Sequence, residues 1–109
     1  MLDKATVREI AKRYADEVCK TLTPQTIILF GSYANGVPHN DSDIDIAVVF
    51  KNFKGNWLET ASYLCGLKRR VSVDIEPHMM DESIDRSGFL ELVMKTGEII
   101  YKKHAYADN

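Results

Sequence analysis

TIILFGSYANGVPHNDSDIDIAVVF, residues 26–50, predicts two β-strands joined by a short connection. Thr26–Phe30 is a β-branched, apolar run that ends at Gly31, and Ser42–Phe50 alternates acids with apolar residues before becoming apolar throughout. Between them, Ser32–Gly36 favours a short helix or turn, and a loop follows. Because this connection is too short for a full crossover helix, we expect some antiparallel pairing within a mixed sheet.

Outward from this stretch, helices and strands alternate along the chain. The expected elements are a helix capped by Asp3 with an apolar stripe from Val7 to Cys19, a helix from Trp57 to Leu67, a strand Val71–Ile75 stopped by Pro77, a helical region Asp81–Thr96, and a strand Glu98–Tyr101. This order predicts an α+β fold of two layers, in which a small mixed sheet carries helices mainly on one face.

Length and composition indicate one globular domain, residues 1–109, whose polar tail 102–109 is expected to be flexible. The chain is 45% hydrophobic and 28% charged, which excludes disorder as a description of the whole chain. Its apolar runs are far shorter than the about 20 residues that cross a membrane. The charged N-terminal segment argues against a signal peptide.

Net charge and cysteine usage narrow the class further. A net charge of −2 argues against a dedicated nucleic-acid-binding protein, which usually presents a basic face. Cys19 and Cys65 are too far apart in sequence to form a short-spaced metal motif. We interpret them as reduced, mostly buried thiols and predict a cytoplasmic protein.

The densest chemical signal is the acidic pair Asp43 and Asp45. Two acids at i and i+2 on a strand lie on one face, with Cα atoms roughly 6.5–7 Å apart, and they repel each other unless a cation lies between them. Mg²⁺ prefers such oxygen ligands. Asp74 would lie beside the pair if its strand is adjacent, and three carboxylates can hold two metal ions. The alternative is that these acids form the solvent face of an edge strand.

The dipeptide Gly31-Ser32 is a candidate phosphate cradle. Gly31 lets backbone approach a ligand without a Cβ in the way, Ser32 offers a hydroxyl, and the following amides open a helix. An ordinary strand-ending turn would have the same composition, so this signal gains weight only beside the acids.

Taken together, Gly31-Ser32-Tyr33-Ala34-Asn35-Gly36 followed by Ser42-Asp43-Ile44-Asp45 resembles the signature of the nucleotidyltransferase superfamily that includes DNA polymerase beta. The short chain is similar to its minimal (MNT) members, and the likeness is strongest over residues 26–76. It implies a polymerase beta palm-like fold. By resemblance, Gly31 and Ser32 would contact the triphosphate, Asp43 and Asp45 would bind two Mg²⁺ ions, and Asp74 would be the third metal-binding, catalytic acid.

Several assignments stay open. Many family members have a basic residue where this chain has Asn35, which predicts weaker nucleotide use. Glu76 shares a face with Asp74 and rivals it as the third acid. The cluster Lys68–Arg70 either complements a helix C-terminus or contacts phosphate or RNA. Tyr33 either stacks on a base or packs under the loop. His78 lacks ligand-spaced companions and is assigned no metal.

The resemblance also implies a function. It predicts Mg²⁺-dependent transfer of AMP from ATP to a hydroxyl, with a tyrosine of a helical HEPN-family toxin as the favoured acceptor and this chain as the antitoxin. One alternative is an antitoxin that acts by binding alone, with little or no catalysis. Another is a small-molecule nucleotidyltransferase that needs a separate acceptor-binding subunit. The sequence leaves base preference and homo- or hetero-oligomeric state open.

Overall fold

A computed structural model describes residues 2–36, 38, 42–85 and 87–104 and builds them around a four-stranded sheet in the order β3-β2-β1-β4. The strands are β1 (Thr26–Phe30), β2 (Ile44–Phe50), β3 (Ile75–Asp81) and β4 (Glu98–Lys102). β1 pairs antiparallel with both β2 and β4, whereas β2 and β3 are parallel. The predicted mixed sheet and antiparallel first pair are therefore confirmed.

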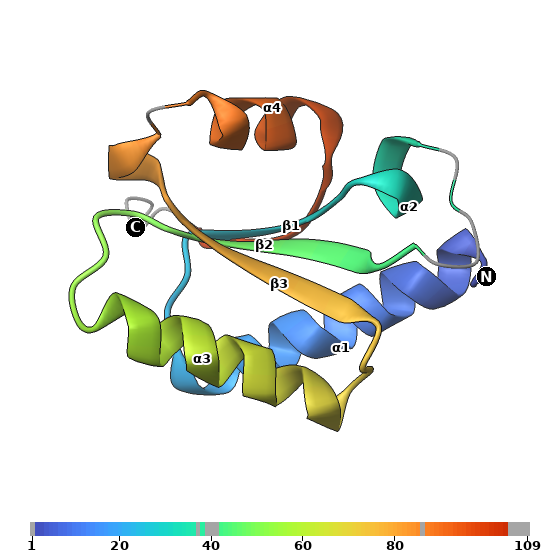
Figure 1. Ribbon diagram of the computed structural model, residues 1–109, viewed down its shortest axis with the longest axis horizontal. Coiled ribbons are helices and arrows are strands. Elements are labelled where there is room, and N and C mark those ends of the chain that lie inside the picture. The colour runs from blue at the N-terminus through green and yellow to red at the C-terminus, as the bar shows by residue number, and fades with distance from the viewer. Residues whose placement is uncertain (1, 37, 39–41, 86, 105–109) are drawn as a thin grey trace.

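Helices cover the sheet unequally on its two faces (Figure 1). The long helices α1 (Lys4–Thr21) and α3 (Trp57–Leu67) pack on one face, over Ile44, Ile46 and Val48. The shorter α4 (Phe89–Thr96) packs on the other, over Ala47 and Val49. Alternate residues of β2 thus enter two different cores, as the predicted division of its faces requires.

Local sequence signals account for the ends of the two long helices. The carboxylate of Asp3 accepts a hydrogen bond from the Thr6 amide at 2.7 Å, and Asn56 caps α3 by accepting from the Glu59 amide at 2.9 Å. The two helices are joined at mid-length, where the buried Tyr14 hydroxyl donates to the Leu64 carbonyl at 2.7 Å. Burial raises the pKa of Tyr14, so this donor stays protonated.

The third strand lies four residues later than expected. Val71 and Ser72 extend a 3₁₀ turn (Lys68–Arg70) by donating to the Lys68 carbonyl, which leaves Val73 72% exposed. β3 begins at Ile75 and passes through Pro77. A proline is tolerated there because β3 is an edge strand, on which half of the amides face away from the sheet.

The last helix is also shorter than expected. Asp81 ends β3, a 3₁₀ turn (Glu82–Ile84) follows, and α4 begins only at Phe89. The Asp85 carboxylate accepts from the amides of Leu90 and Glu91, both at 3.1 Å, and so satisfies the start of the helix. β4 extends to Lys102, one residue beyond the predicted end, and residues 105–109 of the predicted tail lie outside the described residues.

The cysteine expectation holds only in part. Both thiols are free, and Cys19 is half-buried, but Cys65 is exposed on α3.

In the described part of the chain, no helix combines the length and the apolar character needed to span a bilayer.

Asp81 joins three segments at the end of β3. Its buried carboxylate accepts from the amides of Asn52 and Phe53, at 3.0 and 2.8 Å, and from the amide and hydroxyl of Ser83, at 2.8 and 2.7 Å. Burial opposes ionisation, but these four donors outweigh it and lower the pKa of Asp81 to about 2.

We therefore expect Asp81→Asn to lower the free energy of unfolding by about 1–3 kcal/mol at pH 7. A pKa lowered from 3.8 to about 2 adds stability that is present above pH 4 and is lost as the pH falls towards 2. In urea titrations from pH 7 to pH 2, the difference in free energy of unfolding between wild type and variant should become smaller as the pH falls. Asp16→Asn, at an exposed site on α1, is the control and should stay within about 0.5 kcal/mol of wild type. A gap that is constant with pH would contradict the assignment.

Candidate active site

The predicted motif residues gather where β1 ends and β2 and β3 begin. In the register of the sheet, Asp45 lies between Phe30 of β1 and Glu76 of β3. Gly31 follows Phe30 directly and starts the short helix α2 (Ser32–Asn35). Figure 1 shows α2 at this end of the sheet, on the same side as α4.

Asp45, Glu76 and His78 form the one group among the described residues whose side chains are arranged to share a metal ion. One donor atom from each lies within 4.8 Å of the others. The Nε2 atom of His78 is 3.1 Å from Oδ1 of Asp45, and both side chains are partly accessible to solvent. Two carboxylates and an imidazole are a donor set that fits a divalent cation.

The ring of Phe30 packs against His78 and is itself packed against Phe89. The ring of Phe30 meets the imidazole edge to face, with centroids 5.0 Å apart, and Phe89 of α4 meets Phe30 in the same way at 5.9 Å. The sequence predicts no metal at His78, because no other metal-ligating residue stands at a ligand spacing from it. Had Pro77 been placed within an edge strand, the i, i+2 pair Glu76 and His78 would have faced Asp45.

Asp43 and Asp74 lie one step further towards the start of this strand pair. Asp43 is exposed and immediately precedes β2, and Asp74 is exposed in the turn before β3. The Ile44 amide donates to the Asp74 carbonyl at 2.8 Å, which keeps the two segments adjacent. The expectation that Asp74 would lie beside the acidic pair thus holds for its backbone, but Asp43 and Asp74 are outside the Asp45 group.

Gly31 is shaped by its contact with Asp45. Its φ of 79° and ψ of −153° belong to a region that is essentially restricted to glycine. A Cβ built on Gly31 would also collide with the Asp45 carboxylate. The missing side chain therefore lets backbone and carboxylate approach closely. Ser32, half-buried, is the first residue of α2 and accepts from the Gly36 amide through its carbonyl at 3.1 Å.

The structure bears on the open assignments of Tyr33 and of the basic cluster Lys68–Arg70. Tyr33 is buried in the core, and its hydroxyl accepts from the Leu2 amide at 3.3 Å. In the basic cluster, Arg70 lies 3.8 Å from Glu17 of α1, an exposed pair of little energetic weight. Asn35 belongs to α2, and its side chain lies outside what the structure describes.

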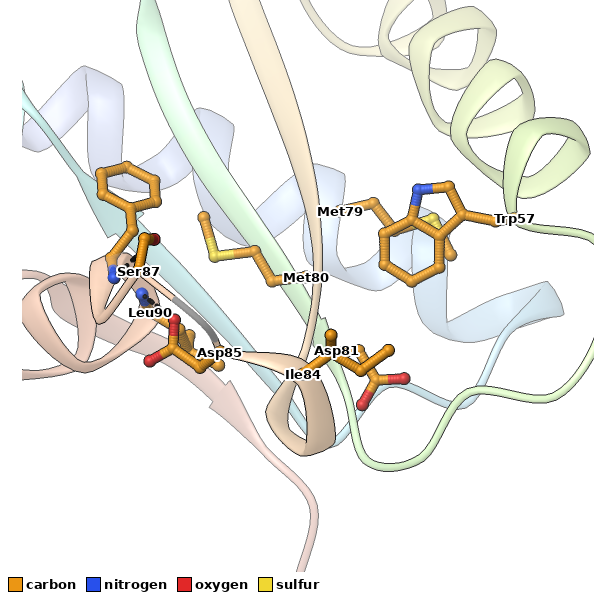
Figure 2. Close-up of a pocket in the computed structure, with 9 residues that line it drawn as sticks. Trp57, Met79, Met80, Asp81, Ile84, Asp85, Ser87 and Leu90 are labelled. Atoms are coloured by element: carbon orange, nitrogen blue, oxygen red, sulfur yellow. Dashed lines mark hydrogen bonds between the residues drawn. The ribbon is translucent and has the colours of Figure 1, made fainter.

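A separate hollow of about 430 Å³ lies at the far end of β3. Figure 2 shows Met79 turned towards Trp57 and Met80 turned towards Leu90, on opposite sides of the strand. This hollow contains none of the predicted site residues, but Phe89, which contacts Phe30, lines it.

Comparison with known proteins gives the same fold. Residues 12–106 match the family model described as polymerase beta, nucleotidyltransferase. Among proteins with curated descriptions, none matches the chain. A crystal structure of a candidate nucleotidyltransferase from Sulfolobus solfataricus is similar at 26% identity and a TM-score of 0.67, over 92% of this chain and 84% of that one.

Two toxin–antitoxin structures have the same fold at lower identity. One, crystallised with AMP-PNP, has 23% identity and a TM-score of 0.65, over 85% of this chain and 74% of that one. The other is the toxin–antitoxin MntA-HpeT with two Asp-to-Glu substitutions, at 20% identity and a TM-score of 0.58, over 94% and 76%.

Proposed function

This chain belongs to the polymerase beta nucleotidyltransferase family, and from that membership we propose that it transfers AMP from ATP to a hydroxyl group of a partner protein. The observation that carries the proposal is the position of Asp45, which faces Glu76 across the strand pair and lies against the backbone of Gly31. The acidic side chains and the Gly31 turn, which we propose to bind metal and phosphate, are thus next to each other.

In this proposal, divalent metal ions are held by the carboxylates of Asp43, Asp45 and a third acid. The resemblance to the family implies two Mg²⁺ ions. When bound, such ions would neutralise charge on the triphosphate and stabilise the transfer of its α-phosphoryl group. Gly31 and Ser32 hold the triphosphate through close backbone approach and the Ser32 hydroxyl. The acceptor oxygen forms a bond to the α-phosphorus, the bond to pyrophosphate breaks, and the third acid takes the hydroxyl proton.

Two residues compete for the role of third acid. Glu76 lies opposite Asp45 in the sheet and belongs to its donor group, which supports Glu76. Asp74 lies beside the start of β2, and the resemblance to the family implies this residue as the third acid. We propose Glu76 for the base and keep Asp74 as the alternative.

Glu76→Gln is expected to lower the rate of AMP transfer by about 100-fold, the contribution of one general base, whereas Asp74→Asn should lower it by less than about tenfold. Single-turnover measurements at saturating ATP isolate the chemical step. Both exchanges keep side-chain size, and both residues are exposed, so circular dichroism should match wild type. The reverse order of effects would assign the base to Asp74.

A partner that supplies the acceptor is the second part of the proposal. A reacting hydroxyl must be held about 3–3.5 Å from the α-phosphorus, in line with the leaving group. Related folds occur in toxin–antitoxin structures, one of them with AMP-PNP. We therefore propose a tyrosine of a helical HEPN-family toxin as acceptor and an antitoxin role for this chain.

Intact-mass spectrometry tests this function. The chain is mixed with its cognate partner and Mg-ATP, and one or more AMP units are expected on the partner and absent with Asp45→Asn. A tight complex without adducts would favour the antitoxin that acts by binding alone. Adducts on added small alcohols or aminoglycosides, but not on protein, would favour the small-molecule transferase.

A further inference from the structure

We propose that His78 is a ligand of the metal centre and gives it a preference for Mn²⁺ over Mg²⁺. The inference rests on the proposed function, because it concerns the same metal-binding site. It departs from the expectation of an all-carboxylate Mg²⁺ centre. The residues that carry it are Asp45, Glu76 and His78, which project from β2 and β3 on one face of the sheet.

The first argument is geometric. Two ligands at adjacent corners of an octahedron, each about 2.1 Å from the ion, lie about 3 Å apart. The Nε2 atom of His78 lies 3.1 Å from Oδ1 of Asp45, so the two donors already have this separation. Glu76 has a carboxylate oxygen within 4.8 Å of both, close enough for a small rotation to bring it to the same ion.

The second argument is that the imidazole has little freedom. In the parallel register, Glu76 is opposite Asp45 and His78 is opposite the buried Ala47, so both donor residues of β3 are anchored by pairing with β2. The ring of Phe30 packs edge to face against the imidazole at 5.0 Å. A side chain held in position loses less conformational entropy when it binds an ion.

The third argument is ligand chemistry. Carboxylates suit Mg²⁺ and Mn²⁺ alike, but imidazole favours transition metals, and affinity rises from Mn²⁺ through Co²⁺. Mg²⁺ strongly prefers oxygen ligands and water. One nitrogen ligand among carboxylates should therefore raise the affinity for Mn²⁺ and Co²⁺ and leave that for Mg²⁺ nearly unchanged.

The competing explanation is that His78 only orients Asp45 by a hydrogen bond. His78→Gln separates the two roles, because the glutamine amide can still donate to Asp45 but lacks the imidazole nitrogen. His104→Gln, at an exposed position after β4, is the matched control. Circular dichroism confirms that each variant is folded before any metal is added.

Cobalt binding gives the direct readout. With Co²⁺ added to the wild type, we expect proton NMR signals of a coordinated imidazole, shifted far outside the protein envelope. These signals should disappear in His78→Gln and persist in His104→Gln. Persistence of the signals in His78→Gln would overturn the proposal.

Binding of Mn²⁺, followed by electron paramagnetic resonance of the free ion with and without a non-hydrolysable ATP analogue, gives the magnitude. Loss of a residue that only hydrogen-bonds to a metal ligand typically weakens metal binding by about tenfold or more. Removal of His78 as a direct ligand should therefore weaken Mn²⁺ binding by at least about tenfold. Calorimetry with Mg²⁺ should show less than about a threefold change, since Mg²⁺ gains little from imidazole. Equal losses of affinity for both ions would assign His78 a positioning role and overturn the preference.

If wild type binds Mn²⁺ and His78→Gln binds it with the same affinity, this inference fails and the proposed transferase stands. If wild type binds neither ion even with nucleotide, both fail.

Discussion

Asp45→Asn is expected to lower AMP transfer by about a thousandfold or more, because a metal-held charge at the reacting phosphoryl group contributes several kcal/mol. Asp45 is the acid that both neighbouring strands and the Gly31 turn approach. Asparagine has the same size and still accepts a hydrogen bond from His78 through its amide oxygen, so the site should keep its shape. Quenched-flow measurement of AMP transfer with saturating partner and ATP gives the rate.

The same variant should be no less stable than wild type without metal. Asp45 and Glu76 are like charges at directly opposed positions of β2 and β3. Relief of such a repulsion is worth about 0.2–1 kcal/mol. Thermal melts should therefore show an equal or higher midpoint for Asp45→Asn, and a smaller rise when Mg-ATP is added. Asp16→Asn, on the exposed face of α1, should behave as wild type in both assays. An unfolded Asp45→Asn protein would mean that the carboxylate is structural.

The parts of the fold that the sequence predicted are those in which local pattern and tertiary environment agree. The run Thr26–Phe30 is buried on both faces, and the alternation in Ile44–Phe50 separates the core under α1 and α3 from the core under α4. The short connection after Gly31 predicts some antiparallel pairing, and β1 and β2 pair in this way. The acidic pair and the Gly-Ser turn lie on this well-predicted part of the chain.

The third strand shows what local pattern misses. Val71 and Val73 are β-branched, and Pro77 is usually a strand breaker, so the pattern favoured a strand four residues too early. Pro77 is tolerated within β3 because β3 is an edge strand, and the position of a strand in the sheet depends on tertiary structure. Glu76, predicted only to share a face with Asp74, lies opposite Asp45 in the sheet. His78 lies beyond the expected strand end, so its place beside Asp45 and Glu76 could not be predicted from sequence spacing.

The start of α4 was misplaced for a related reason. The sequence from Asp81 onwards is compatible with helix, but the Asp81 carboxylate is engaged by donors from the loop after β2, 28 and 29 residues away along the chain. Those contacts keep Asp81 in β3 and delay the helix until Asp85 can cap it. Such long-range hydrogen bonds leave no trace in hydrophobic periodicity.

Gly31→Ala is expected to lower AMP transfer by about a thousandfold in protein that remains folded. A methyl group at this position collides with the Asp45 carboxylate, so one of the two must move. Displacement of a reacting group by about 1 Å costs about 100-fold. Retreat of the turn from the triphosphate adds a further loss of about tenfold or more, because backbone donors act only at hydrogen-bonding distance.

The same change should lower the free energy of unfolding by about 1–3 kcal/mol, since alanine is strained at the backbone angles of Gly31. Gly88→Ala is the control for a glycine of positive φ without a collision: Gly88 is in the left-handed region, with φ of 78° and ψ of 6°, and nothing lies within 4 Å of where its Cβ would be. It should lose about 1–2 kcal/mol from left-handed backbone strain while keeping its transfer rate.

A double-mutant cycle identifies the collision itself. If the Gly31→Ala penalty includes contact with the Asp45 carboxylate, it should shrink in an Asp45→Ala background, which removes that carboxylate. What remains should be the backbone strain of alanine at the φ and ψ of Gly31, without the collision. Urea titration of the four Gly31/Asp45 proteins measures the coupling, and strictly additive losses would show that Gly31 and Asp45 do not meet. A coupling of the expected sign would mean that this glycine is required because the turn that we propose to bind phosphate and the acid that we propose to bind metal occupy adjoining space.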